Sequence, residues 1–176
     1  MKIWLNVTLI ILFLTGCTTK TQFIDLGTNL ETDREPEFQW PVDGATLSQK
    51  FRPKKRHPYR RKHEGIDLAA KRNTPIYAVD HGVVRYAGHG RSGYGRLVVI
   101  EHIDKRFSSY YAHLSRYKVE RGDVVRKGDL VGLMGNSGRS TGVHLHFEIR
   151  KNKVAVNPLD YLPTEATNTQ QANPQP

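Results

Sequence analysis

The sequence contains very little cysteine, tryptophan or methionine, with one, two and two residues respectively among 176. Because Cys17 is the only cysteine, the chain has no internal disulfide, and its stability must come from a core or from a bound metal. The apolar run from Ile3 to Leu14 is too short to span a bilayer. No stretch shows amphipathic helical periodicity over three turns, which argues against a helical bundle.

Acidic residues are also scarce relative to basic ones, 17 against 27, so the formal net charge is +10. A basic surface suits nucleic acid, anionic lipid or an anionic wall polymer, unless it is simply solvated. Hydrophobic residues make up 38% of the chain and aromatic residues 9%. This composition predicts a globular core rather than a disordered chain.

The N-terminus decides among these partners. Lys2 and the apolar run that follows are typical of a secretion signal, which we assign to residues 1–16. Leu14-Thr-Gly-Cys17 resembles the bacterial lipobox, which implies that Cys17 is lipidated and holds the protein at a membrane. The alternative is a buried N-terminal helix with an incidental thiol. Export argues against nucleic acid and favours an anionic cell wall. If the cell has two membranes, Thr18 after the cysteine resembles the signal for outer-membrane sorting, facing the periplasm.

The rest of the chain divides by composition. Residues 17–38 are polar and predict a lipidated tether. The domain is expected to begin near Phe38 and to occupy residues 39–163, while residues 164–176 predict a disordered polar tail. The basic segment from Arg52 to Lys62 contains two prolines and predicts a loop. It is either simply solvated or forms a rim that attracts an anionic substrate, and both interpretations stay open.

From Ile66 onward the sequence reads as short strands separated by tight turns. The segments that predict strands are 75–79, 82–87, 96–102, 107–113, 130–134 and 143–150. A glycine-rich loop is expected at 88–95 and a helical turn within 114–119. Strands spaced in this way predict a mainly β domain, an antiparallel sheet or sandwich with little helix.

The stretch Thr141–Glu148 carries two histidines, His144 and His146, separated by one apolar residue. In a strand, alternate side chains share a face, so both imidazoles would project from one side. Leu145 and Phe147 would then point into the core. Two imidazoles at this spacing can serve one metal, or one metal and one reacting group.

Two further motifs supply partners for this pair. Residues 63–67 (HEGID) contain His63 and Asp67, and residues 111–114 (YAHL) contain His113. Gly65 is expected to let the backbone turn tightly between the first two. Glu148 would share the face of His144 and His146, where it either accepts a hydrogen bond from a ligand or forms a salt bridge with a neighbouring cation.

The order and spacing of these motifs closely resemble those of the lysostaphin-type (LytM-type) zinc metallopeptidases, the M23 family, over about Trp40–Leu162. The resemblance implies a LytM domain of the duplicated hybrid motif type. In that family the positions of His63, Asp67 and His146 bind one zinc ion per chain, and those of His113 and His144 line the site and assist catalysis. Two imidazoles and a carboxylate are good zinc ligands and leave a fourth position for water.

The resemblance also implies a function: hydrolysis of peptide cross-links between peptidoglycan stems, in wall remodelling or cell separation. Some family members have lost metal ligands and activate amidases in the divisome. The alternative is therefore a catalytically silent module that binds peptidoglycan and activates a wall amidase, although all five polar positions are retained here. Two questions stay open. One is whether the bond cut joins D-alanine to a diamino acid or lies in a glycine-containing bridge. The other is how His113 and His144 divide their roles.

Overall fold

The computed structural model of this protein describes residues 36, 38–52, 62–104 and 106–164. The predicted secretion signal, Cys17, most of the tether, most of the basic loop and nearly all of the polar tail lie outside these residues. Among the described residues, no helix is long and apolar enough to cross a membrane.

Eleven strands and one short 3-10 helix make up the described part of the chain. They are β1 (Thr46–Gln49), β2 (Ile66–Ala69), β3 (Pro75–Tyr77), β4 (Gly82–Gly90), β5 (Gly95–His102), β6 (Phe107–Leu114), β7 (Arg116–Tyr117), β8 (Val124–Val125), β9 (Leu130–Leu133), β10 (Leu145–Lys151), β11 (Val154–Val156) and η1 (Pro158–Asp160).

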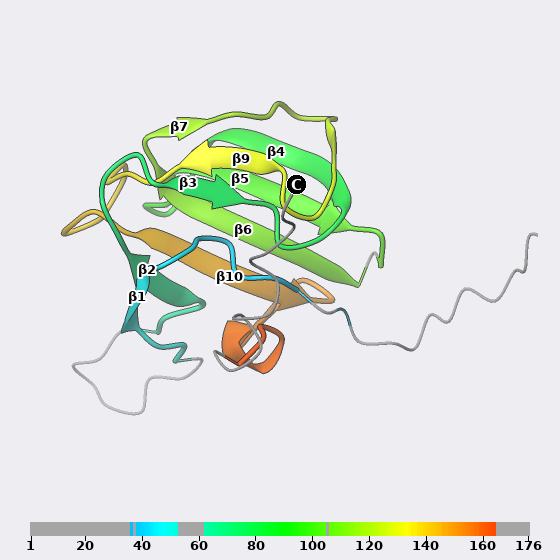
Figure 1. The fold of residues 1–176 in the computed structure, drawn as a ribbon, viewed down its shortest axis with the longest axis horizontal. Helices are drawn as coiled ribbons and strands as arrows, with labels where there is room; N and C mark the ends of the chain where they lie inside the picture. The colour runs from blue at the N-terminus through cyan, green and yellow to red at the C-terminus, as the bar shows by residue number, and fades with distance from the viewer. Residues whose placement is uncertain (1–35, 37, 53–61, 105, 165–176) are drawn as a thin grey trace, which may run out of the picture. The chain divides into compact units, whose positions relative to one another are not determined.

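The strands form two sheets. The larger has the order β1-β2-β10-β6-β5-β4-β8, with β11 added to β10, and the smaller has the order β3-β9-β7. Every strand pair is antiparallel. The smaller sheet lies over one face of the larger (Figure 1). The prediction of a mainly β, antiparallel domain with little helix is confirmed.

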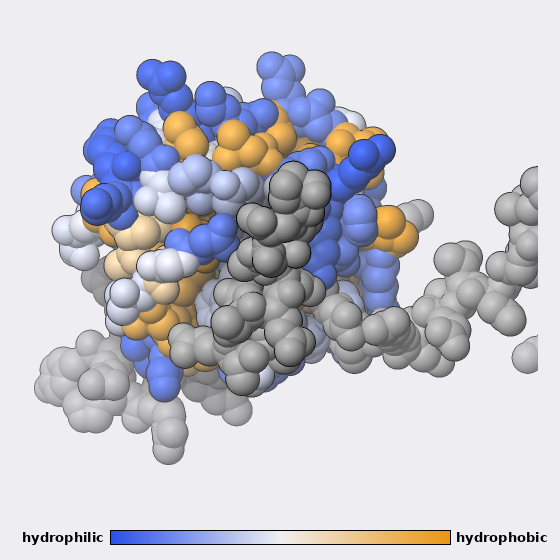
Figure 2. All heavy atoms as spheres, viewed as in Figure 1, coloured by the Kyte–Doolittle hydropathy of each residue, from blue (hydrophilic) through white to orange (hydrophobic). Residues whose placement is uncertain are grey.

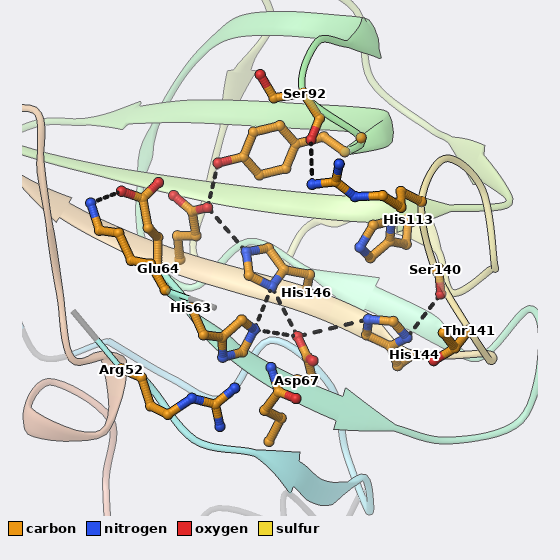
Figure 3. A pocket seen from close by; sticks show the side chains of 16 residues that line it. Arg52, His63, Glu64, Asp67, Ser92, His113, Ser140, Thr141, His144 and His146 are labelled. Carbon is orange, nitrogen blue, oxygen red and sulfur yellow. Dashed lines mark hydrogen bonds and ion pairs between the residues drawn. The ribbon is translucent and has the colours of Figure 1, made fainter. Parts of the chain in front are cut away.

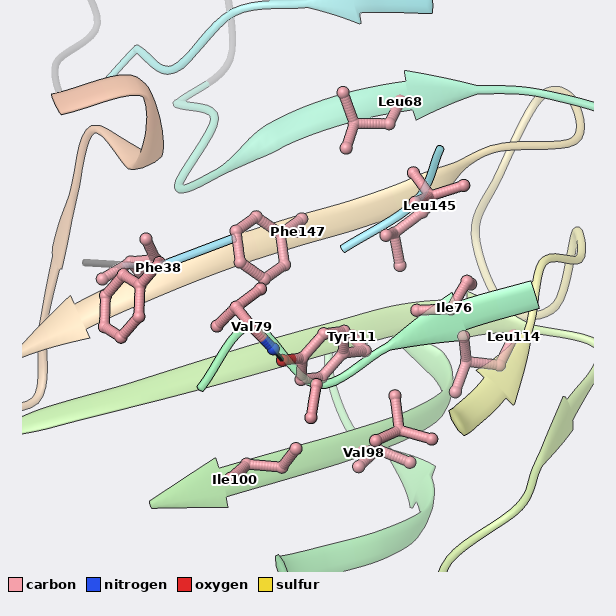
Figure 4. Close-up of a cluster of buried hydrophobic side chains, with 14 of the residues drawn as sticks. Phe38, Leu68, Ile76, Val79, Val98, Ile100, Tyr111, Leu114, Leu145 and Phe147 are labelled. Atoms are coloured by element: carbon pink, nitrogen blue, oxygen red, sulfur yellow. Dashed lines mark hydrogen bonds between the residues drawn. The ribbon is translucent and has the colours of Figure 1, made fainter. Parts of the chain in front are cut away.

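The core lies between the two sheets. Leu145, Phe147 and Ile149 of β10 are fully buried and alternate with polar residues that face the other side. Tyr111 of β6 packs against Phe147, with ring centroids 5.4 Å apart, and Ile76 of β3 closes the core from the smaller sheet (Figure 4). This arrangement leaves the opposite face of β10 free to carry chemistry.

Two local expectations were wrong. The segment 114–119 contains no helical turn, because Arg116 and Tyr117 pair with β9 as strand β7. The glycine-rich segment 88–95 is not one loop. Instead β4 continues to Gly90 and β5 begins at Gly95, so only a tight turn joins them.

The two ends of the folded unit meet in the core. Phe38 is 1% exposed and stacks near His102, Phe107 and Tyr161, although its position in the sequence suggested the end of the tether. Trp40 donates from Nε1 to the carbonyl of Pro163 at 3.0 Å. The folded unit therefore takes in Phe38.

The surface mixes hydrophilic and hydrophobic groups. Figure 2 shows hydrophilic side chains around the hydrophobic ones on the face turned toward the viewer. The large hydrophobic side chains that stay exposed come from separate segments of the described chain. They are Tyr86, Ile103, Tyr117, Val124, Leu130 and Val154.

Candidate metal centre and active-site cleft

A cleft of about 650 Å³ opens beside the polar face of β10. Figure 3 shows this cleft from close by. The structure brings all five predicted site residues together in its lining: His63, Asp67, His113, His144 and His146. They come from three segments that are far apart in sequence, residues 63–67, 111–114 and 141–148.

Strand pairing places three of these side chains at one point. β2 pairs with β10 so that Asp67 lies opposite His146. Asp67 Oδ1 is 3.0 Å from His63 Nε2 and 2.9 Å from His146 Nδ1, and these two nitrogens are 3.1 Å apart. The three donor atoms thus form a small triangle that faces the cleft.

Gly65 lets the two strands approach, but not in the predicted way. Its φ is not positive, so no unusual turn requires glycine there. A Cβ atom at this position would instead overlap the carbonyl of Phe147 on β10. The glycine is needed because two backbones lie in close contact.

The triangle fits a tetrahedral metal ion. In such a site with bonds of 2.0–2.1 Å, donor atoms are about 3.3 Å apart, so the triangle needs to open by only a few tenths of an ångström. The remaining ring nitrogens are already engaged. His63 Nδ1 donates to the carbonyl of Lys50 at 2.9 Å, and His146 Nε2 donates to Glu148 at 3.0 Å. Both rings therefore direct lone pairs at Asp67 and at each other, an arrangement that a cation would stabilise.

The pKa shifts of Asp67 and His146 show the same preference for positive charge. Burial raises the pKa of Asp67, but hydrogen bonds to His146 and His63 outweigh it and hold the pKa well below its usual range. Burial lowers the pKa of His146, but its hydrogen bonds to Asp67 and Glu148 outweigh this effect and raise the pKa to about 9. Both shifts therefore show that the triangle favours positive charge at its centre.

A buried carboxylate fixes His146 from behind. Glu148 has no exposed side-chain surface, and it accepts hydrogen bonds from His146, from the hydroxyl of Tyr94 at 2.6 Å and from Arg150 Nε at 2.7 Å. The sequence left two interpretations of Glu148 open, a hydrogen bond to a ligand and a salt bridge to a cation. Both contacts are present, because Glu148 orients His146, a candidate ligand, and pairs with Arg150.

His113 reaches the cleft through a β-bulge. Tyr111 points into the core, so strict alternation would send His113 there too. The pairing of β5 with β6 shifts register between Arg96 and Val98, and His113 has φ +60°. The left-handed backbone turns its side chain toward the cleft. Its Nδ1 donates to the carbonyl of Ser137 at 2.8 Å, which leaves Nε2 unprotonated in the neutral ring.

His144 lies just before β10 and has the same tautomer. Its Nδ1 is 3.0 Å from the carbonyl of Gly142 and 3.2 Å from Ser140 Oγ. Its Nε2 is 3.7 Å from Asp67 Oδ1, and its ring centroid is 4.8 Å from that of His113. Two free Nε2 atoms therefore lie beside the triangle.

Comparison with known proteins agrees with this geometry. The model of "Peptidase family M23" matches residues 61–158, more than half of the chain. This chain belongs to peptidase family M23. Among its relatives, the DD-carboxypeptidase/endopeptidase Mpg of Neisseria meningitidis is 45% identical over 105 residues, which are 59% of this chain and 24% of that protein. The murein hydrolase activator NlpD of Salmonella dublin is 37% identical over 126 residues, 72% of this chain and 31% of its own.

Solved M23 folds are similar as well. A zinc-containing peptidase from Vibrio cholerae superposes with a TM-score of 0.63 at 32% identity, over 70% of this chain and 39% of that one. Further M23 relatives are lipoproteins by name, consistent with the cell envelope. The matched region spans only 24% of Mpg and 31% of the Salmonella NlpD.

Sequence reasoning missed several residues of this M23 site. Tyr94 and Arg150 both contact Glu148, and Arg150 lies over the ring of Tyr110 at 4.3 Å. Period-two alternation along β10 runs from His146 through Glu148 to Arg150, so it was a usable signal for Arg150. The contribution of Tyr94 depends on the turn between β4 and β5, which has no such pattern.

Proposed function

We propose that this M23 chain is a zinc metalloendopeptidase that hydrolyses peptide cross-links of peptidoglycan. The observation that carries the proposal is the triangle of His63, Asp67 and His146, with two further imidazoles beside it. The donor set suits zinc, one ion per chain, and leaves the cleft side open for water and substrate. The name of the relative Mpg supports DD-peptide chemistry for this family branch.

The position of each side chain in the cleft suggests its role in hydrolysis. His63, Asp67 and His146 would hold the ion, and a zinc ion in such a site lowers the pKa of a bound water and polarises a carbonyl. Burial, only partly opposed by the hydrogen bond to Ser137, lowers the pKa of His113 to about 4. Its Nε2 is therefore a free proton acceptor at neutral pH.

His113 and His144 can together manage the protons of peptide hydrolysis. Either Nε2 can take a proton from the attacking water, and the imidazolium formed can then donate to the leaving amine. Backbone carbonyls hold both Nδ1 atoms, so each ring keeps the tautomer in which Nε2 faces the reaction. The neighbouring ring of His144 contributes further to lowering the pKa of His113.

We further propose that the chain is a lipoprotein of the cell envelope. In this proposal residues 1–16 are a removable signal, Cys17 carries the lipid, residues 17–38 tether the domain and residues 164–176 form a polar tail. An outer-membrane location facing the periplasm would place the cleft next to peptidoglycan. Lipoprotein relatives of this chain support the anchor.

The second candidate is an activator of a wall amidase, favoured by the similarity to NlpD. The two candidates differ in what the cleft must do. An activator needs a binding surface but has no use for a metal triangle with two free Nε2 atoms beside it. The geometry therefore supports the hydrolase better.

Zymography of the purified protein against isolated sacculi, with and without a chelator, tests the choice. We expect clearing that depends on about one zinc per chain. His146→Ala should lose both zinc and clearing, whereas His113→Ala and His144→Ala should keep zinc and lose turnover by roughly 100-fold or more. Full clearing by His146→Ala, or by wild type stripped of metal, would contradict the hydrolase. Zinc-loaded protein that only stimulates a purified amidase would establish the activator instead.

A further inference from the structure

Arg52 is a charged residue of the cleft with no role in the metal triangle. It lies beyond β1 at the edge of the larger sheet and pairs with His63 through two backbone hydrogen bonds of 2.8 and 2.9 Å. Its side chain lines the cleft, and Figure 3 shows its guanidinium beside His63. Its Nε is buried and has no hydrogen-bond partner among the described residues.

Most of the other charged side chains of the cleft have partners within the chain. Lys62 pairs with Glu64, Glu148 pairs with Arg150, and Asp67 belongs to the metal triangle. Arg139, across the cleft, donates to the carbonyl of Ser92. Arg52 forms no ion pair with any carboxylate in the described part of the chain. A divalent ion in the triangle would add further positive charge beside it. A guanidinium that lines the cleft without a carboxylate of its own suits an anionic partner from outside the chain.

A second polar side chain lies along the same edge. Gln49 is the strand partner of Asp67, so their side chains share a face, and Gln49 also lines the cleft. Gln49 and Arg52 thus stand opposite Asp67 and His63, respectively. A guanidinium binds a carboxylate through two parallel hydrogen bonds, and a neighbouring amide can add a third donor.

We propose that Arg52, assisted by Gln49, is a carboxylate-binding subsite that recognises the free α-carboxylate of the residue whose amine is released. This inference rests on the proposed peptidase function and deepens it. When the bond cut joins D-alanine to the second amine of a diamino acid that has two carboxyl groups, that amine and a free carboxylate share one carbon atom. In a glycine-containing bridge the corresponding carboxyl group is bound in the next peptide. The subsite therefore selects the first kind of cross-link.

A matched pair of substrates tests this subsite. Both are muropeptide dimers joined through D-alanine and a diamino acid. In one the carboxylate next to the released amine is free, and in the other it is amidated. The zinc-loaded full chain, Arg52→Gln, Arg52→Lys and the control Arg126→Gln are compared for kcat and KM on each. Arg126 is exposed and lies outside the cleft, so its replacement makes the same charge change elsewhere. Calorimetric binding of both dimers to His113→Ala, with and without Arg52→Gln, gives a readout that does not need turnover.

We expect wild type to prefer the acid through KM, and Arg52→Gln to raise KM for the acid roughly 10- to 100-fold while leaving the amide unchanged. Arg52→Lys should fall between them, and Arg126→Gln should match wild type. The subsite is overturned if wild type does not distinguish the dimers, or if Arg52→Gln weakens both equally. If the wild type cuts neither dimer, the proposed peptidase function fails. The subsite is then decided by the calorimetric measurement, as the ratio of the affinities for the acid and for the amide. Should Arg52→Gln not fold, the wild-type preference and its reduction in Arg52→Lys decide the matter.

Discussion

Each histidine of the cleft uses one ring nitrogen for the cleft and gives the other to a fixed oxygen. For His63, His113 and His144 that oxygen is a backbone carbonyl, and for His146 it is the carboxylate of Glu148. These contacts set the tautomers before any ligand arrives. The carboxylate makes His146 the exception, because it adds charge as well as orientation.

Replacement of Glu148 by glutamine should therefore act on the metal rather than on substrate binding. Burial raises the pKa of Glu148, but hydrogen bonds from His146, Tyr94 and Arg150 outweigh this effect and lower it, so the native group is a carboxylate. Glu148→Gln removes that charge behind His146. We expect zinc affinity to fall by about 10- to 100-fold, measured by competition with a chromophoric chelator.

Glu64→Gln is the matched control for this experiment. Glu64 pairs with Lys62 and lies 3.4 Å from Arg150, but it has no contact with His146. The change removes the same charge from the same network at a partly exposed position. An equal loss of zinc affinity in both variants would show that net charge, rather than the contact with His146, matters.

A second residue-level prediction concerns His102, which lies away from the metal triangle. Burial lowers the pKa of His102 and is opposed in part by the hydrogen bond to the His81 carbonyl and by the charge of Asp80. The folded state thus favours the neutral ring. The stability it contributes is complete above the unfolded pKa of about 6.5 and is lost as pH falls from there toward the lower folded value.

Urea unfolding at a series of pH values between 7.5 and 5 measures this effect. Wild type should lose more free energy of unfolding across this range than His102→Gln, which retains groups to bond the His81 carbonyl and Ser109. All other titrating groups are common to both proteins, so the difference isolates His102. Identical pH dependence in the two proteins would exclude the assignment.

At the level of elements, the alternation of side chains along β10 gave the most useful prediction of which residues face the cleft and which face the core. It placed His144 and His146 on one face and Leu145 and Phe147 on the other, as the structure has them. Local patterns failed where pairing partners decide the conformation. Arg116 and Tyr117 become a strand because β9 is there to pair with, and no feature of 114–119 itself reveals this.

The site shows the same division between local and distant causes. Motif spacing selected the five polar residues that meet in the cleft. The bulge that turns His113 outward depends on its register against β5, and Arg52 joins the cleft because it pairs with His63. Neither relation is visible in a single sequence. Roles in catalysis and metal binding remain predictions for all five residues.

Strand approach at Gly65 yields a prediction for the β2–β10 pair. A Cβ in Gly65→Ala would overlap the Phe147 carbonyl and force these strands apart, whereas Gly142 has nothing within 4 Å of the same atom. We expect Gly65→Ala to lower the free energy of unfolding by about 1–3 kcal/mol or more and to weaken zinc binding. Gly142→Ala should stay within about 0.5 kcal/mol of wild type. Thermal unfolding and zinc titration of both variants check this, and equal stability would refute the close-contact argument.

On the scale of the whole molecule, the two faces of the larger sheet have different roles. One of its faces supports the core under the smaller sheet, and the other carries the cleft. The ends of the folded unit lie together, since Phe38 and Trp40 reach Tyr161 and Pro163. Changes to these ends should therefore affect stability without touching the ligands.

Two fragments test how much the N-terminal segment contributes. The fragment 36–164 keeps Phe38 and Trp40, while 41–164 lacks both. Loss of a buried phenylalanine alone costs about 3–5 kcal/mol, so 41–164 should be much less stable than 36–164 in urea. Phe38→Ala in the full chain should reproduce most of the loss, and Tyr86→Ala, at a 38% exposed position, should reproduce little. If 41–164 matched 36–164 in stability, Phe38 would be dispensable to the core. The folded unit would then begin at the strands rather than at the segment that joins its two ends.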